Sequence, residues 1–190
     1  MTHPYTIPNF LTALRIVLIP AVVVLFYLPY NWADMACGLM FALAGITDTF
    51  DGYLARRLGQ VSPLGAFLDP VADKLIVAVA LVLLVSRDPA WYVTMTAAVI
   101  IGREIAISAL REWMAEIGAR RKVAVSALGK FKTIMQVVGL SMMLFRQDLL
   151  FLPIYEIGLA LTVLAAVLTL WSMVAYLRAA WPDLRGEGGA

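Results

Sequence analysis

The chain has 190 residues, of which 62% are hydrophobic and 15% are charged, and its net charge is +2. A soluble domain is about half apolar and about a quarter charged, so this composition indicates an integral membrane protein rather than a soluble enzyme. The apolar excess runs along the whole chain, so we expect one domain, residues 1–182, with a short flexible tail at 183–190. No basic residue precedes Arg15, so the first apolar run should be retained rather than cleaved as a signal peptide.

Six apolar segments are long enough to cross a bilayer as helices, which requires about 20 residues each. They are residues 8–28, 32–55, 64–85, 90–113, 127–145 and 151–177. The sequence therefore predicts an all-α integral membrane protein with six transmembrane helices.

The basic residues in the connections and at the ends of these segments are distributed unequally between the two sides. The short connections on one side contain only Arg87 and Arg146. The other side carries Arg56, Arg57, Arg111, Arg120, Arg121, Lys122, Lys130, Arg178 and Arg185. Because an excess of Lys and Arg marks the cytoplasmic side of a membrane protein, we expect both termini to face the cytoplasm.

Four aspartates lie around the connection between the second and third predicted helices. Asp48 and Asp51 are three residues apart, and Asp69 and Asp73 are four residues apart. On a helix these spacings separate the side chains by only about 60° and about 40°, so each pair shares one face. The connection is short enough to make the two helices antiparallel neighbours, so both pairs should converge near the cytoplasmic interface.

Four neighbouring carboxylates repel one another and need positive charge among them. Oxygen ligands of this kind suit Mg²⁺, Mn²⁺ or Ca²⁺, whereas a zinc site is not expected because His3 is the only histidine. Two metal ions are the common arrangement for in-line displacement at phosphorus. Gly52 and Gly65 would leave space for a bulky ligand, although small residues also serve simply to let membrane helices pack closely.

The residues around the aspartates form a longer pattern. Its fixed positions are Asp48, Asp51, Gly52, Ala55, Arg56, Gly65, Asp69 and Asp73. This pattern resembles the signature of the CDP-alcohol phosphotransferases, complete and with the expected spacing. The resemblance implies six membrane helices, a homodimer, and transfer from a CDP-linked donor to an alcohol with release of CMP.

Further segments, "IPNFLTALR", "GREIAISALREWMAEIG" and "VSALGKFKTIMQ", resemble the bacterial members of this family that make phosphatidylglycerol phosphate. That resemblance implies CDP-diacylglycerol as donor, sn-glycerol 3-phosphate as acceptor, and a multi-pass protein of the bacterial inner membrane whose active site faces the cytoplasm. Membrane lipid is then an expected partner, and no nucleic acid is.

The resemblance also assigns expected roles by matching positions. Asp48, Asp51 and Asp69 would hold Mg²⁺ or Mn²⁺, with two ions expected, and Asp73 would complete a metal site and accept the proton of the attacking hydroxyl. The residues expected to contact the CDP-diacylglycerol are Asn9, Thr12, Gly52, Arg56, Ser62 and Gly65.

A second set of charged residues lies in or beside the fourth and fifth predicted helices. An unpaired arginine inside a membrane span, such as Arg103, is costly. Its partner could be Glu104, although adjacent residues on a helix point about 100° apart. Arg and Lys are natural ligands of a dianionic phosphate. We therefore expect an acceptor-phosphate site formed by Arg103, Arg111, Lys130 and Lys132.

Two alternatives remain at this point. Within the family, the chain could be a phosphatidylserine, phosphatidylinositol or cardiolipin synthase, and a serine acceptor would not require the cationic site. Outside it, a divalent-cation transporter could use the same aspartates, but transport favours acidic residues near the midplane of several helices rather than at one cytoplasmic end.

Overall fold

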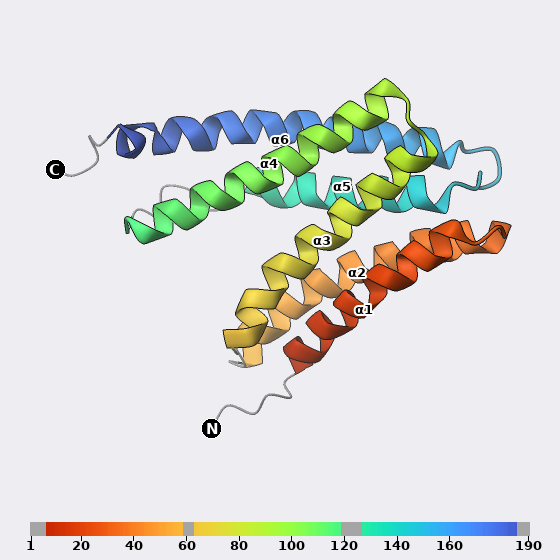
Figure 1. Ribbon diagram of the computed structural model, residues 1–190, viewed down its shortest axis with the longest axis horizontal. Coiled ribbons are helices and arrows are strands. Elements are labelled where there is room, and N and C mark those ends of the chain that lie inside the picture. The colour runs from red at the N-terminus through yellow and green to blue at the C-terminus, as the bar shows by residue number, and fades with distance from the viewer. Residues whose placement is uncertain (1–6, 59–62, 119–126, 186–190) are drawn as a thin grey trace.

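The computed structural model describes residues 7–58, 63–118 and 127–185, and within them the chain forms α-helices throughout its long segments. The helices are α1 (Ile7–Tyr27), α2 (Asn31–Leu58), α3 (Pro63–Arg87), α4 (Trp91–Glu116), α5 (Ala127–Phe145) and α6 (Ile154–Leu184) (Figure 1). The all-α prediction is confirmed, and each of the six apolar segments corresponds to one helix.

Most helix ends lie within three residues of the prediction, but α6 was expected to end at residue 177 and continues to Leu184, because Arg178 ends the apolar run without ending the helix. Two further differences have a local backbone cause. The sixth segment was expected to begin at residue 151, but α6 begins at Ile154, after a turn in which Leu150 has a φ of 60° and just after Pro153. An apolar composition does not reveal such a turn. The fourth segment was expected to end at residue 113, but α4 continues to Glu116 and is closed by Gly118, whose φ of 75° favours glycine.

Helix α3 connects the two parts of the bundle. Figure 1 shows it crossing from the α1–α2 pair to the group formed by α4, α5 and α6. It contacts α1, α2, α4 and α5, while α5 also contacts α2 and α6, and α4 contacts α6. The middle of the molecule is therefore bounded by α3, α4, α5 and α6 together, which is where the candidate site lies.

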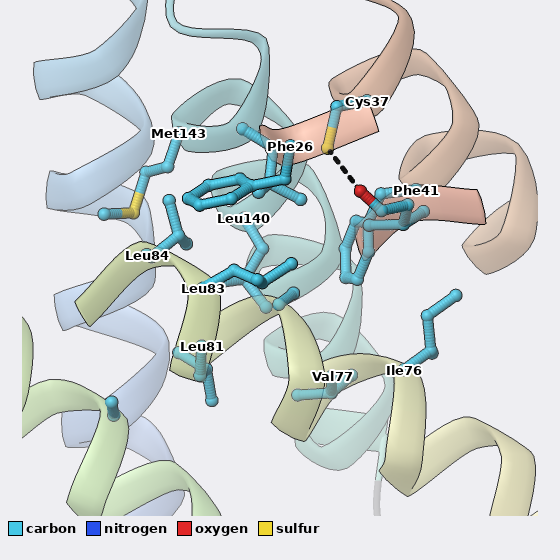
Figure 2. Close-up of a cluster of buried hydrophobic side chains, with 14 of the residues drawn as sticks. Phe26, Cys37, Phe41, Ile76, Val77, Leu81, Leu83, Leu84, Leu140 and Met143 are labelled. Carbon is cyan, nitrogen blue, oxygen red and sulfur yellow. Dashed lines mark hydrogen bonds between the residues drawn. The ribbon is translucent and has the colours of Figure 1, made fainter. Parts of the chain in front are cut away.

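The main hydrophobic core contains buried side chains from all six helices, several of which are labelled in Figure 2. Phe26 of α1, Phe41 of α2, Leu84 of α3 and Leu140 of α5 each have at most 3% of their surface exposed. A second, smaller cluster joins α4 to α6 and includes Met114, which is fully buried. Because side chains from every helix meet in the main core, the helices pack as one unit rather than as two separate bundles.

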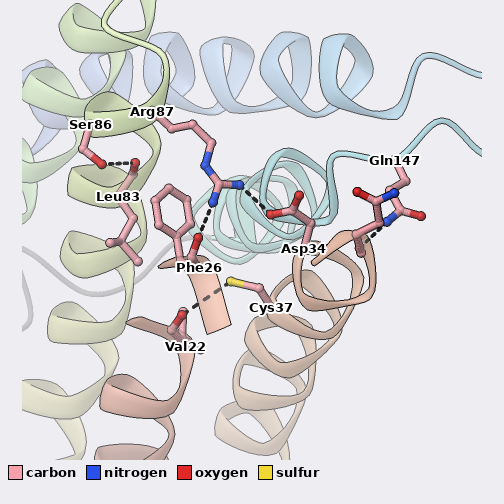
Figure 3. Close-up of polar contacts among 9 residues, drawn as sticks. Val22, Phe26, Asp34, Cys37, Leu83, Ser86, Arg87 and Gln147 are labelled. Carbon is pink, nitrogen blue, oxygen red and sulfur yellow. Dashed lines mark hydrogen bonds and ion pairs between the residues drawn. The ribbon is translucent and has the colours of Figure 1, made fainter. Parts of the chain in front are cut away.

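Polar contacts join the helix ends that lie farthest from the four aspartates of the signature. Arg87, near the end of α3, pairs with Asp34 of α2 at 2.5 Å and donates a hydrogen bond to the backbone carbonyl of Phe26 (Figure 3). Its guanidinium also lies 3.8 Å from the centre of the Phe26 ring. Tyr155 of α6 donates a hydrogen bond to Asp88 at 2.5 Å. The Arg87 contacts join α3 to α1 and α2, and the Tyr155 contact joins α6 to the α3–α4 connection, so side chains as well as short connections hold this end of the bundle together.

Two helices of the described residues are clearly long and apolar enough to cross a bilayer, namely Trp91–Glu116 and Ile154–Pro182. Shorter apolar helices are Ala13–Tyr27 and Phe131–Phe145. Large apolar side chains are also widely exposed, including Trp91 and Trp171 at 76% each. An exposed apolar surface of this extent is unfavourable in water and suits a helical membrane protein.

Helices α5 and α6 approach each other closely at two glycines. A Cβ atom placed on Gly139 would lie 2.4 Å from the Thr162 hydroxyl oxygen and 2.8 Å from the Gly158 carbonyl oxygen. A Cβ atom placed on Gly158 would lie 2.7 Å from the Gly139 carbonyl oxygen. The two backbones therefore leave no room for any side chain at this crossing.

We expect Gly139→Ala to destabilise the protein, because the added methyl group meets backbone and a buried side chain that cannot both move away. Overpacking of this kind costs about 1–3 kcal/mol, so the thermal unfolding temperature in detergent should fall by several degrees. Gly102→Ala is the matched control, because a Cβ atom there would have nothing within 4 Å. An unfolding temperature for Gly139→Ala that equals that of Gly102→Ala would contradict the close approach.

Candidate functional site

A polar cavity of about 400 Å³ lies among α3, α4, α5 and α6. Its lining residues are Asp73, Lys74, Val77, Arg103, Glu104, Arg111, Lys132, Thr133, Gln136, Val137 and Tyr176. Val77 also belongs to the main core, and Tyr176 to the smaller α4–α6 cluster. The cavity therefore adjoins both apolar clusters, and it brings four cationic and two anionic side chains together in an otherwise apolar bundle.

The two most deeply buried cations of the cavity are Arg103 of α4 and Lys132 of α5, each only 6% exposed. Arg103 Nη1 lies 2.5 Å from Glu104 Oε1, and Arg103 Nη2 lies 3.4 Å from the hydroxyl oxygen of Ser172 on α6. Lys132 Nζ donates to the same hydroxyl oxygen at 3.0 Å. Glu104, which the sequence offered as a possible partner, does pair with Arg103, because the two long side chains reach around the helix to meet.

Arg111 lies two helical turns after Arg103 on α4 and lines the same cavity. Its guanidinium carbon is 5.6 Å from the centre of the Tyr176 ring. Within the described residues, the Nε atoms of Arg103 and Arg111 are buried and have no hydrogen-bond acceptor. A buried N–H group without an acceptor is costly, so both groups suit an anionic ligand in this cavity.

Asp73 of α3 is half-buried and faces the cavity. Asp69 lies one turn earlier on α3, and Asp48 and Asp51 lie in the second half of α2. The helical placement of all four matches the prediction, but the side chains of Asp48, Asp51 and Asp69 are outside the described part. Among described residues no three potential metal ligands come together, so the predicted convergence of the four carboxylates stays a prediction.

The residues predicted to bind the donor are described only in part. Asn9 and Thr12 are in α1, Gly52 and Arg56 are in α2, and Gly65 is buried near the start of α3, whereas Ser62 lies outside the described residues. The side chains of Asn9, Thr12 and Arg56 are also outside the described part.

One further cation was predicted at a site, and another is buried although the sequence analysis did not select it. Lys130, predicted at the acceptor site, is in α5, two residues before Lys132, but its side chain is outside the described part. Arg15 of α1, which the sequence analysis did not select, is only 1% exposed.

The structure also adds residues that the sequence analysis missed. They are Thr133 and Gln136 of α5, and Ser172 and Tyr176 of α6. Gln136 could have been found, because it follows Lys132 by four residues and so shares its helix face. Ser172 carries no such signal, since only the packing of α6 against α4 and α5 brings its hydroxyl between two cations.

The cavity combines the groups needed to hold a phosphate and to remove a proton from a nearby hydroxyl. Arg and Lys side chains provide charge-assisted hydrogen bonds to phosphate oxygens, and Arg103, Arg111 and Lys132 come from two different helices. A carboxylate such as Asp73 is a suitable general base if an acceptor hydroxyl lies within hydrogen-bond reach. The excess of cationic over anionic side chains favours an anionic ligand over a neutral one.

Comparison with known proteins agrees with this chemistry. The family model for CDP-alcohol phosphatidyltransferase matches residues 5–172. A protein of Salmonella choleraesuis named CDP-diacylglycerol–glycerol-3-phosphate 3-phosphatidyltransferase is 54% identical over 180 residues, covering 95% of this chain and 97% of its own length. A relative of the same name in Shigella flexneri serotype 5b is 53% identical over 95% of this chain and 97% of its own length. Another, in Sodalis glossinidius, is 54% identical over 94% of this chain and 96% of its own length. The chain therefore belongs to the CDP-alcohol phosphatidyltransferase family.

Proposed function

We propose that this protein transfers the phosphatidyl group of CDP-diacylglycerol to sn-glycerol 3-phosphate, giving phosphatidylglycerol phosphate and CMP. The observation that carries the proposal is the cavity in which Arg103, Arg111 and Lys132 lie close to Asp73. The names of the relatives support the same reaction, since they state this acceptor and this transfer. An acceptor without a phosphate, such as serine or inositol, would leave the buried Nε groups of Arg103 and Arg111 without an anion to bind.

In this proposal the phosphate of the acceptor binds to Arg103, Arg111, Lys130 and Lys132. The Nε atoms of Arg103 and Arg111, which lack an acceptor among the described residues, would donate to phosphate oxygens. Lys132 has N–H groups left beyond the one directed at Ser172. The binding of the phosphate in this cavity would fix the glycerol hydroxyl near Asp73.

Divalent cations, Mg²⁺ or Mn²⁺ and as many as two, are part of the proposal. The donor set fits them: Asp73 borders the cavity, and Asp69 lies four residues earlier on the same helix, so both offer hard oxygen ligands. Asp48, Asp51, Asp69 and Asp73 would hold the ions. When bound, the ions would neutralise the pyrophosphate and make CMP a better leaving group.

The transfer itself is a displacement at phosphorus. The free primary hydroxyl oxygen of glycerol 3-phosphate attacks the phosphorus that carries the diacylglycerol group. A new P–O bond forms there as the bond to the bridging oxygen breaks, and CMP leaves with that oxygen. The proton of the hydroxyl passes to the Asp73 carboxylate. Asn9, Thr12, Gly52, Arg56, Ser62 and Gly65 would hold the CDP-diacylglycerol.

The membrane arrangement in the proposal follows the sequence. All six helices would span the membrane, with both termini and the cavity on the cytoplasmic side, as the distribution of Lys and Arg favours. We infer a bacterial inner-membrane protein that forms a homodimer and consists of one catalytic domain, residues 1–182, followed by the short predicted tail at 183–190, of which 186–190 lie outside the described residues. Helix α6 extends to Leu184, into the first residues of that tail.

Purified protein with CDP-diacylglycerol and Mg²⁺ or Mn²⁺ should release CMP with glycerol 3-phosphate, and far less with glycerol, serine or inositol. The phosphate distinguishes these acceptors, and the cationic cavity is where it would act. A chelator should abolish turnover, and added Mg²⁺ or Mn²⁺ should restore it. The measurement is CMP release together with identification of the lipid product.

A preference for serine or inositol would replace the proposed acceptor. Release of CMP with none of these acceptors, together with Mg²⁺ uptake into proteoliposomes, would favour transport instead. Full activity in the chelator would contradict metal dependence.

Asp73→Asn should lower kcat by about 10²–10⁴-fold, the usual contribution of a general base. The amide keeps the shape of the side chain but cannot accept the proton. Asp148→Asn, a change at an exposed aspartate in the α5–α6 connection, is the control and should leave kcat near that of the unmodified protein. A folded Asp73→Asn protein with near-normal kcat would remove Asp73 from the role of base.

Arg103→Ala should raise the KM for glycerol 3-phosphate by at least about tenfold, because the lost charge-assisted hydrogen bonds are worth about 1.5–3 kcal/mol each. The KM for CDP-diacylglycerol should change much less, since the donor is proposed to bind at α1, α2 and the start of α3. Arg178→Ala, at an exposed position of α6, is the control. An equal rise in both KM values would make Arg103 a structural charge rather than an acceptor ligand.

A further inference from the structure

The hydroxyl group of Ser172 lies between the two buried cations of the cavity. Arg103 Nη2 approaches its oxygen from α4 at 3.4 Å, and Lys132 Nζ approaches it from α5 at 3.0 Å. Ser172 itself belongs to α6, so one small side chain joins three helices. The residues that line the cavity do not include Ser172, so it contacts the two cations without lining the cavity itself.

The hydrogen bonds of this hydroxyl are fully used. A serine hydroxyl has one hydrogen to donate and two lone pairs to accept with. Its hydrogen is donated to the Thr169 carbonyl oxygen at 2.9 Å. Both lone pairs are then left for Arg103 and Lys132, so the carbonyl of the preceding helical turn directs the hydroxyl to act as acceptor toward both cations.

The Ser172 hydroxyl is uncharged, so it binds both cations without cancelling their positive charge. The two cations repel each other, and a carboxylate in the place of Ser172 would hold them together but neutralise them. A hydroxyl holds them at a defined separation while leaving their positive charge available. Glu104 restrains Arg103 through Nη1, and Nε is the guanidinium nitrogen that is buried without an acceptor among the described residues. The guanidinium cannot rotate without losing contacts at both terminal nitrogens.

We propose that Ser172 is a positioning residue, whose hydroxyl sets the separation and orientation of Arg103 and Lys132 for the phosphate of the acceptor. The inference rests on the proposed function, because it concerns the same anion site. Ser172 does not touch the acceptor; it acts through the two cations. Its loss should therefore weaken acceptor binding specifically, without affecting the donor side.

Ser172→Ala should raise the KM for glycerol 3-phosphate by about tenfold, equivalent to about 1.4 kcal/mol, and should leave the KM for CDP-diacylglycerol within about twofold of its original value. Ser172→Thr keeps the hydroxyl and should restore most of the acceptor affinity. Ser172→Cys keeps the size but replaces the oxygen with a weak acceptor, so its acceptor KM should resemble that of Ser172→Ala. The Cys variant keeps the test valid if Ser172→Ala does not fold.

Ser141→Ala is the matched control. Ser141 of α5 also donates to the carbonyl of the preceding turn, that of Val137 at 2.7 Å, but it does not line the cavity. This variant should leave both KM values unchanged. A Ser172→Ala protein with the same acceptor KM as Ser141→Ala, or with equal rises in both KM values, would overturn the inference while leaving the proposed function intact.

A second readout separates the inference from the reaction. Inorganic phosphate and glycerol 3-phosphate should each raise the thermal unfolding temperature of the protein in detergent, and the rise should be lost in Ser172→Ala and retained in Ser172→Thr. If the unmodified protein releases no CMP with glycerol 3-phosphate, the proposed function fails. A phosphate-dependent rise that still requires the Ser172 hydroxyl would then support the positioning role, and an equal rise in all variants would refute it.

Discussion

Two positive charges inside an apolar helix bundle impose the constraint on which the rest of this structure depends. Arg103 and Lys132 are almost fully buried, and buried charges are costly unless other groups compensate them. The compensation comes from Glu104 on the same helix and from Ser172 on α6. It therefore requires α6 to lie at one defined register against α4 and α5. The close approach of Gly139 and Gly158 fixes part of that register, so packing between backbones determines where the charges can be held.

The existence of the helices followed from the sequence because an apolar run of about 20 residues has few alternatives in a membrane. The fifth helix has the predicted bounds, and the others begin and end within three residues of theirs, except that α6 ends at Leu184 rather than at residue 177. The largest error is at the end of α6, where Arg178 ends the apolar run but not the helix. Others occur where local backbone conformation sets the boundary. Leu150 has a left-handed backbone conformation, and α6 begins only after it, at Ile154. Gly118 closes α4 after Glu116, three residues beyond the predicted end at Trp113. Neither feature alters the apolar pattern from which the spans were predicted.

The candidate site was predictable only where chemistry or spacing marks a residue. An arginine within an apolar span, such as Arg103, is conspicuous because of its cost, and the structure brings it together with Arg111 and Lys132 around one cavity. The roles of these residues remain predictions, as do those of the four aspartates. Ser172 and Tyr176 are ordinary residues of an apolar helix, and their importance arises only from contacts between helices that are far apart in sequence. No local pattern carries that information.

The position of Ser172 and Tyr176 on the last helix has a consequence for how the protein acquires its site during synthesis. Chains emerge N-terminus first, so α4 and α5 are made before the helix that supplies both residues. Until α6 packs against them, Arg103 and Lys132 have no shared acceptor, and the cavity lacks one of its walls. A nascent chain that stops before Ile154 would therefore contain every aspartate of the signature and every predicted acceptor cation, yet have no complete anion site. Assembly of the site is thus coupled to completion of the chain, and truncated products would be inactive without any change in their signature residues.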